Sequence, residues 1–152
     1  TNISGTPNND NGGSIIGLST TIDFSTGSKI LISVCIMGGW ENKQWNKGVI
    51  LARRFVGDDN TSVYLRADGT VGAHGQLLGQ FLMRDIASHS SMESCIFNYI
   101  DTPTSNGPYE YMPVLVNTDS VNASFSLQQT YGTGNDTWYE RGVSSMILQV
   151  IS

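Results

Sequence analysis

Alternating apolar and polar residues over short segments are the feature of this sequence that most constrains its fold. Residues 16–24 and 30–36 each place larger, mostly apolar side chains at every second position. A period of two puts these side chains on one face of an extended strand, whereas an amphipathic helix repeats about every 3.6 residues. A Ser-Thr-Gly-Ser turn at 25–28 joins the two segments. We therefore predict a pair of antiparallel strands here.

Comparable segments follow at intervals of about ten residues, with turn residues between them. We expect strands at 49–55, 62–67, 77–86, 92–100, 109–116 and 143–151, and a further strand with Val121, Ala123, Phe125 and Leu127 on one face. The 77–86 segment is also compatible with a short helix. Asp68-Gly69 predicts a hairpin turn. Pro113 indicates an edge position or a bulge, because proline has no amide hydrogen to donate.

Strands at this spacing, with no convincing helix of ordinary length, predict an all-β fold. The architectures that fit are an antiparallel β-sandwich or a jelly roll. The 152 residues of the chain suit one domain with a proper core. We expect that domain at 14–152, preceded by a flexible arm or linker at 1–13 that is rich in Asn, Gly and Pro.

The charge balance excludes several classes of partner. The formal net charge is −5, and Lys and Arg together number 8. A protein that neutralises phosphates needs clustered basic residues, so nucleic acid and anionic membrane surfaces are not expected as partners. No apolar run approaches the roughly 20 residues that cross a bilayer, so membrane insertion is not expected either.

The two cysteines, Cys35 and Cys95, both lie in apolar, strand-like segments. An extracellular disulfide scaffold of this length usually carries more cysteines. We therefore favour buried free thiols, with a single Cys35–Cys95 bridge as the alternative.

Several short motifs occur in an order that is found in a known group of domains. They are Ile-Asp-Phe at 22–24, Ser-Thr-Gly-Ser-Lys-Ile-Leu-Ile at 25–32, Tyr-Ile-Asp-Thr-Pro at 99–103, the aromatic strand at Tyr109 and Tyr111, and Arg-Gly-Val-Ser-Ser-Met-Ile-Leu at 141–148. This order resembles the jelly-roll domains in virion proteins of tailed bacteriophages, which occur in tail fibres and in capsid fibres or decoration proteins. The resemblance runs from about residue 15 to the end of the chain.

The resemblance implies a trimeric module on the surface of a virus particle, similar in outline to the tumour-necrosis-factor-like jelly roll. Its partners would be two further copies of the chain, other virion proteins and host-surface carbohydrate. A trimer buries aromatic side chains around a threefold axis. The residues we assign to this trimer interface are Tyr99, Tyr109, Tyr111 and Tyr139.

Two segments combine aromatic and polar residues. The segment 40–46 departs from the pattern of those domains, and 131–140 is part of a long loop before the last strand. Aromatic rings stack on the apolar face of a sugar, and side-chain amides bind its hydroxyl groups. The candidate ligand-binding residues are therefore Trp40, Asn42, Gln44, Trp45, Tyr131, Asn135 and Trp138. The alternative, which we favour for the rings, is packing against a sheet edge or a neighbouring subunit.

Metal binding and catalysis have weak support in the sequence. Asp58-Asp59-Asn60 and Asp68 are ordinary turn residues as well as oxygen ligands, and no EF-hand loop is present. His74 and His89 are not accompanied by a Gly-x-Ser-x-Gly elbow, although Asp85, His89 and the serines near it could be imagined as a triad. We predict no catalytic residue, no metal and no cofactor.

Asp101 lies between two aromatic segments, in Tyr-Ile-Asp-Thr-Pro at 99–103. Pro103 biases Thr102 toward an extended conformation, and an aspartate carboxylate accepts backbone N–H groups in an Asx turn. Asp101 is therefore predicted to form a turn rather than to act in catalysis.

These observations together predict a non-enzymatic virion domain, a trimeric fibre tip that contacts a receptor or glycan on the host surface. It would be assembled in the host cytoplasm and exposed on the particle. The first alternative is a capsid decoration or head-fibre domain that binds coat subunits. An enzyme that degrades surface polysaccharide and a secreted jelly-roll binding module are further alternatives.

Overall fold

The computed structural model describes residues 13–14, 18–40, 47–57, 62–72, 75–81, 92–117, 125–128 and 142–152. No described residue lies in a helix. The strands are β1 (Gly13–Ser14), β2 (Thr20–Phe24), β3 (Lys29–Trp40), β4 (Lys47–Phe55), β5 (Val63–Leu65), β6 (Val71–Gly72), β7 (Gly79–Gln80), β8 (Glu93–Asp101), β9 (Gly107–Asn117), β10 (Phe125–Leu127) and β11 (Ser145–Ile151). The expectation of an all-β chain is confirmed for these residues.

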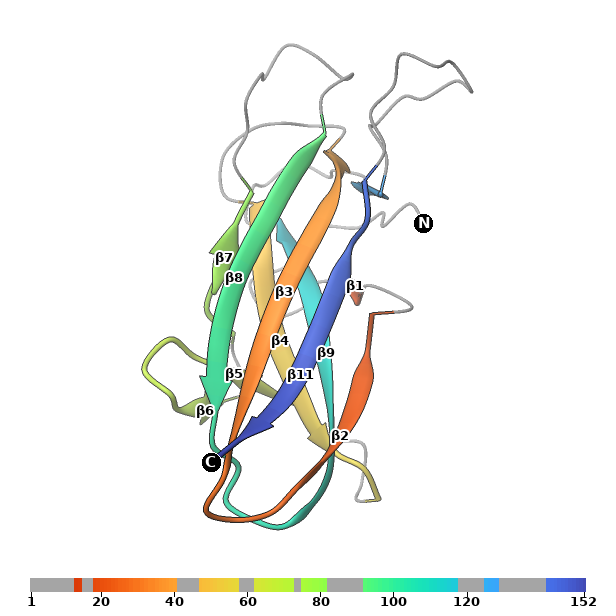
Figure 1. Cartoon of the computed structure of the whole chain (residues 1–152). Coiled ribbons are helices and arrows are strands. Elements are labelled where there is room, and N and C mark those ends of the chain that lie inside the picture. Colours follow the sequence, from red (N-terminus) through yellow and green to blue (C-terminus); the bar gives the residue numbers. More distant parts are fainter. Residues whose placement is uncertain are drawn as a thin grey trace.

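The strands form two antiparallel sheets that pack against each other. The larger sheet has seven strands, in the order β1-β9-β4-β5-β6, with β2 also paired to β9 and β7 to β4. The smaller sheet has four strands, in the order β10-β3-β11, with β8 on the other side of β3. Figure 1 shows β8, β3 and β11 lying in front of β4 and β9.

Strand β3 is the central strand of the smaller sheet, and its alternation sets the inner face. Ile30, Ile32, Val34 and Ile36 are all buried, while the residues between them are only partly buried. The predicted period of two over 30–36 is therefore confirmed. The inward residues of β8 and β11 face the same core, because Ile32 pairs with both Tyr99 and Leu148.

Strands β4 and β9 differ from β3, because both of their faces are buried. Val49, Leu51 and Leu115 belong to the core between the sheets. The alternate residues Ile50, Ala52, Val114 and Val116 form a second buried cluster on the outer side of the larger sheet. A strand with two buried faces requires a continuous apolar run rather than alternation, and both segments contain one.

Pro113 lies inside β9, where it pairs with Leu51 of β4. On the other side of β9, the residues before it pair with β2 as far as Tyr111, and those after it pair with β1 from Val114 onward. Pro113 thus falls in the interval between two short partner strands. No residue of β1 or β2 pairs with Pro113, so its missing amide donor is tolerated there. The position is locally like an edge, although β9 itself is an inner strand.

Two of the predicted turns have the expected geometry. In the turn after β2, Gly27 has a φ of 96°, which an L-residue with a side chain rarely adopts. In the hairpin between β5 and β6, Gly69 has a φ of 81°, and its amide donates to the Arg66 carbonyl. The Asp68 carboxylate accepts from the amide and the hydroxyl of Thr70, so the Asp68-Gly69 hairpin is confirmed.

Both cysteines are free thiols, as we favoured, but only Cys95 is buried as predicted. They lie on neighbouring strands but on opposite faces of the smaller sheet, since Cys35 pairs with Ile96 and Cys95 pairs with Ile36. Cys95 is buried in the core, whereas Cys35 points outward and is only half-buried. Side chains on opposite faces of a sheet cannot meet in a disulfide without rearranging the strands.

Some expectations lie wholly or partly outside the described residues. These are the arm at 1–13, of which only Gly13 is described, residues 82–86 of the segment 77–86, and the segment 121–124. Within 77–86, β7 is a strand of two residues, Gly79–Gln80.

Candidate functional site

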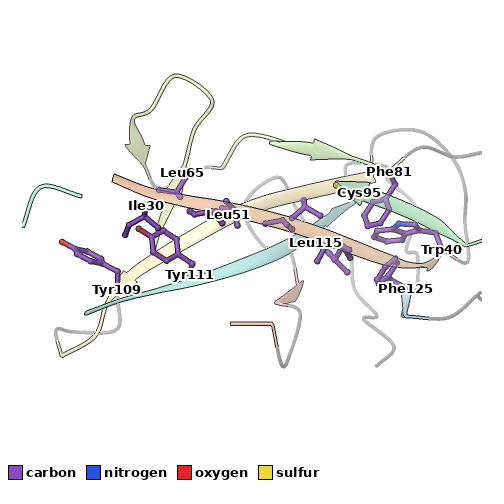
Figure 2. Packing of buried hydrophobic residues seen from close by; sticks show 14 of the residues in the cluster. Ile30, Trp40, Leu51, Leu65, Phe81, Cys95, Tyr109, Tyr111, Leu115 and Phe125 are labelled. Carbon is purple, nitrogen blue, oxygen red and sulfur yellow. The ribbon is translucent and has the colours of Figure 1, made fainter. Parts of the chain in front are cut away.

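One end of the sandwich gathers the ends of strands from both sheets. The end of β3 and the start of β4 lie there, because the Lys47 ammonium of β4 lies over the Trp40 ring of β3. Trp40 also pairs with Phe125 of β10, and Lys47 pairs with Asn117 of β9. The start of β8 lies at the same end, because Glu93 pairs with Gly38. We call this region the aromatic end, defined by Trp40, Phe81 and Phe125. Figure 2 shows these three rings together at one end of the core, with Tyr109 and Tyr111 at the other.

The three rings of the aromatic end pack closely. The centroid of the Trp40 ring lies 4.8 Å from that of Phe125 and 5.7 Å from that of Phe81, and the two phenylalanine centroids are 5.4 Å apart. All three side chains are buried. Tilted and edge-to-face contacts at these distances add to the free energy gained from burial. This end of the core is therefore rigidly packed.

A buried lysine supports the same rings. The Lys47 side chain is 1% exposed, its Nζ lies 5.5 Å from the Trp40 ring centroid, and it donates a hydrogen bond of 3.3 Å to Asn117 Oδ1. A buried ammonium is stable only with such compensation, from a ring face and from hydrogen bonds. Lys47 therefore fixes the position of Trp40 relative to β4 and β9.

The structure describes one of the seven predicted ligand-binding residues. Trp40 is 2% exposed and packs in the core. Packing is the alternative that we favoured for its ring. The other six, Asn42, Gln44, Trp45, Tyr131, Asn135 and Trp138, lie in 41–46 and 129–141, outside the described residues. Ligand binding by these six residues stays a prediction.

The described flanks of 41–46 and 129–141 lie on paired strands. Strand β10 pairs with the last residues of β3, and the Gln128 amide donates to the Met37 carbonyl at 2.7 Å. The Gly142 amide in turn donates to the Gln128 carbonyl at 3.3 Å. The segment 41–46 therefore begins after Trp40, opposite Phe125, and 129–141 begins and ends beside Met37, three residues earlier on the same strand. The sequence alone does not indicate this arrangement.

A polar network joins the two sheets at the opposite end. Asp101 of β8 accepts, through Oδ2, hydrogen bonds of 2.6 Å from both Arg53 Nη1 and the Tyr111 hydroxyl, which belong to the larger sheet. Its Oδ1 accepts the Thr102 amide at 2.9 Å. This contact is to the next residue and is not the predicted Asx turn, because Pro103, two residues on, has no amide hydrogen. Asp101 is instead the last residue of β8, and its carboxylate joins the two sheets. Removing one partner of such a buried, paired charge is strongly destabilising.

The tyrosines next to this carboxylate hold their protons tightly. Burial raises the pKa of the Tyr111 hydroxyl well above its usual value, and the charge of Asp101 raises it further. Burial, and then the charge of Asp101, also raises the pKa of Tyr99. A hydroxyl that remains protonated serves as a hydrogen-bond donor, so both groups suit a structural role better than a catalytic one.

The predicted trimer-interface tyrosines point into the sandwich where they are described. Tyr111 is fully buried, and Tyr109 packs edge-to-face against Phe24 and Phe55. Tyr99 is half-buried and donates to the Arg66 carbonyl at 2.8 Å. Tyr139 lies outside the described residues. Because these rings fill the inside of one subunit, the interface inferred below uses other side chains.

A surface that the sequence reasoning missed is the outer face of the smaller sheet. Its exposed side chains include Ile96, Ile100 and Ile147, with exposed fractions of 69%, 52% and 61%. The available signal was that the outer set of β8 is uncharged and alternates Ile96 and Ile100 with the polar Ser94 and Asn98, while Cys95, Phe97 and Tyr99 form the inner set. The solvated face of an antiparallel strand is normally more polar than this.

Among the described residues, no group of three His, Cys, Asp or Glu side chains could hold a metal ion. Asp68 belongs to its own hairpin, where hydrogen bonds from Thr70 lower its pKa. Asp58, Asp59, His74 and His89 lie outside the described residues. Within the described ranges, no helix is long and apolar enough to cross a membrane. No family model and no curated protein matches the chain.

Proposed function

We propose that the chain is a non-enzymatic module of a bacteriophage virion, a homotrimeric jelly roll that forms a fibre tip and contacts a receptor or glycan on the host surface. The observation that supports this function best is the contact between β10 and the end of β3. It joins the two strands from which the segments with the predicted ligand-binding residues extend, 41–46 after Trp40 and 129–141 after Gln128, which lies opposite Met37.

The packing of the aromatic end suits such a function. Binding residues gather on loops that a rigid scaffold positions, and here buried rings and the buried Lys47 provide the scaffold. A trimer presents three copies of each loop, so weak contacts to a repeated surface glycan add up through avidity.

The jelly-roll topology is part of the proposal. Its support is the repeated crossing of the chain between the sheets: β2, β4 and β9 belong to the larger sheet, whereas β3 and β8 belong to the smaller one. Such crossings between two antiparallel sheets occur in jelly rolls and in other Greek-key sandwiches.

Binding to host bacteria tests the proposed function. Fluorescently labelled chain is incubated with cells that the phage infects and with polysaccharide purified from their surface. We expect saturable binding that falls at least about fivefold in Trp45→Ala and in Trp138→Ala, because a stacked ring contributes on the order of 1 kcal/mol or more. Thr104→Ala, an exposed residue at the end opposite the aromatic end, is the control. Trp40→Ala is unsuitable because it opens a cavity in the core.

The alternatives give different results. Lack of binding to cells and polysaccharide, combined with antibody label on the phage head, would identify a capsid decoration or head-fibre domain. Release of oligosaccharides from the polysaccharide would identify an enzyme and overturn the proposal.

A further inference from the structure

The outer face of the smaller sheet is formed by the residues of β8, β3 and β11 that point away from the core. The pairing aligns these residues in rows across the sheet: Ile100 lies beside Leu31, and Ile96 beside Cys35. Ile147 lies beside Ser33, between those two rows. Leu31 and Cys35 of β3 thus link Ile100 and Ile96 on one side to Ile147 on the other, around the polar Ser33 and Asn98. We call this surface the apolar face.

Its composition is unusual for a surface in water. The outer face of an antiparallel sheet is normally polar when it is solvated. Here Ile96, Ile100 and Ile147 are each more than half exposed. No described segment crosses in front of β8, β3 and β11 in Figure 1. Isolated exposed apolar residues are common, but a contiguous patch marks an interaction site.

The charge of the apolar face favours a second copy of the chain as its partner. No Asp, Glu, Lys or Arg is present at the outward positions of β8 or β11, or of β3 beyond Lys29 at its first residue. The chain as a whole has a net charge of −5. Two copies that meet through this face therefore bring no carboxylates together, which avoids repulsion between two chains of the same net sign.

The size of the apolar face also fits a protein interface. Three strands spaced about 4.8 Å apart, over seven residues at about 3.3 Å each, cover roughly 330 Å² of flat area. A stable interface buries about 800 Å² on each partner, with an apolar centre inside a polar rim. The apolar face thus has the dimensions of such a centre, and uncharged Asn98, Ser145 and Gln149 lie within or beside it.

We propose that the apolar face is the surface through which copies of this chain associate, with Ile96, Ile100 and Ile147 at the centre of the contact. This inference rests on the proposed function, which supplies the homo-oligomer. It adds the surface through which the copies touch. It does not depend on the number of copies or on the ligand of the aromatic end.

The two cysteines provide a probe that needs no substitution. Cys35 lies on the apolar face, so association should shield it from a maleimide reagent. Cys95 lies on the inner face, and burial raises its pKa to about 12, so it stays silent in the native chain. The labelling rate therefore reports the state of the apolar face alone.

The experiment measures mass and labelling rate together on the 152-residue chain. Sedimentation and light scattering between about 0.1 and 100 μM should give an oligomer that dissociates on dilution, with Cys35 labelled at least tenfold faster when dilute. Ile96→Glu and Ile147→Glu each place a carboxylate at the centre of the contact and should raise the dissociation constant at least about 30-fold. The matched control is Val71→Glu, an apolar residue of β6 that is 43% exposed, and it should change neither quantity. Circular dichroism verifies that each variant is folded.

Each outcome has a defined meaning. An oligomer that persists in both glutamate variants, with Cys35 still reactive, overturns the inference but leaves the proposed virion function intact. A wild-type chain that is monomeric at 100 μM with a reactive Cys35 also overturns it. If Cys35 is then protected on virus particles, the partner is a different virion protein. A dimer in place of a trimer contradicts the proposed trimer and supports the inference.

Discussion

Both sheets carry apolar residues on their outer faces, yet these residues have opposite surroundings. On the larger sheet, Ile50 is 1% exposed and packs with Val114 and Val116 in a buried cluster. On the smaller sheet, Ile96 is 69% exposed. An isoleucine on the outer face of the larger sheet thus contributes to the stability of the subunit, whereas one on the outer face of the smaller sheet is left exposed.

This difference shows how the strands of a sandwich can be apolar on both sides for two reasons. The chain itself can bury the outer side, as it does over Ile50, where Gly75 fits against the side chain so tightly that a Cβ atom on residue 75 would overlap it. Otherwise the outer side remains for another molecule, as we infer for the apolar face. Substitutions on the two sides should therefore separate folding from association.

The largest loss of stability is expected from a comparison of two neighbours in β8, Asp101 on the inner side and Ile100 on the outer side. Asp101→Ala leaves Arg53 and the Tyr111 hydroxyl without their shared acceptor, so the free energy of unfolding should fall by about 3–5 kcal/mol. Ile100→Ala, on the outer side, should lower it by less than about 1 kcal/mol. Urea unfolding at a concentration where the chain is monomeric measures both. Equal losses would contradict the distinction between the two sides of β8.

The same truncation on the two outer faces gives the next largest contrast. Ile50→Ala removes buried methyl and methylene groups and should destabilise the monomer by about 2–4 kcal/mol. Ile96→Ala should cost less than about 1 kcal/mol in the monomer and should weaken association instead. Urea unfolding and sedimentation of both variants test this. A monomer destabilised as much by the Ile96 substitution would mean that the chain itself covers the apolar face.

A smaller effect is expected where β11 joins the smaller sheet. Ser144 Oγ accepts the Met37 amide at 2.9 Å and donates to the Met37 carbonyl at 3.2 Å, which fixes the start of the strand that carries Ile147. Ser144→Ala leaves both groups without this partner and should cost about 1–2 kcal/mol. The exposed neighbour is the matched control, and Ser145→Ala should cost less than about 0.5 kcal/mol. Amide hydrogen exchange in β11 should accelerate only in the first variant.

The last effect depends on alkaline pH and concerns the inner face of the smaller sheet. Burial raises the folded-state pKa of Cys95 to about 12 and that of Tyr111 above its usual value. A raised pKa in the folded state gives stability that is fully present below the unfolded-state pKa and is lost as pH rises toward the folded-state value. Stability should therefore decline from about pH 9 upward. Urea titrations from pH 8 to 11 measure how steeply the free energy of unfolding falls with pH. Cys95→Ala should make this fall less steep, and an unchanged steepness would mean that Cys95 is not responsible.

The sequence was informative wherever one side of a strand is buried and the other is not. The alternation of β3 and the Asp68-Gly69 hairpin follow from residue spacing and from the steric freedom of glycine, which are local properties. The buried position of Trp40 and the neighbouring flanks of 41–46 and 129–141 depend on pairing between β3 and β10, about 85 residues apart. No local pattern encodes such a pairing.

The polar residues illustrate the same limit. Asp101 was predicted to form an Asx turn, but its local contact is with the amide of the next residue, Thr102, since Pro103 has no amide to donate. Its contacts with Arg53 and Tyr111 arise because two sheets pack together, and sequence spacing does not contain this information. The exposed Ile96 and Ile147 were visible in the sequence, but nothing in a single strand indicates which of its two apolar sides the fold leaves uncovered.

Strand β3 also has a consequence for the order in which the chain is built. It pairs on one side with β8 and on the other with β10 and β11, so its partners lie some 60 to 120 residues later in the sequence. During synthesis the smaller sheet remains incomplete until β11 has left the ribosome, and folding dominated by such distant contacts is slow. Ile147 is the last of the three exposed isoleucines to be added, so the surface for association is complete only once β11 has joined β3.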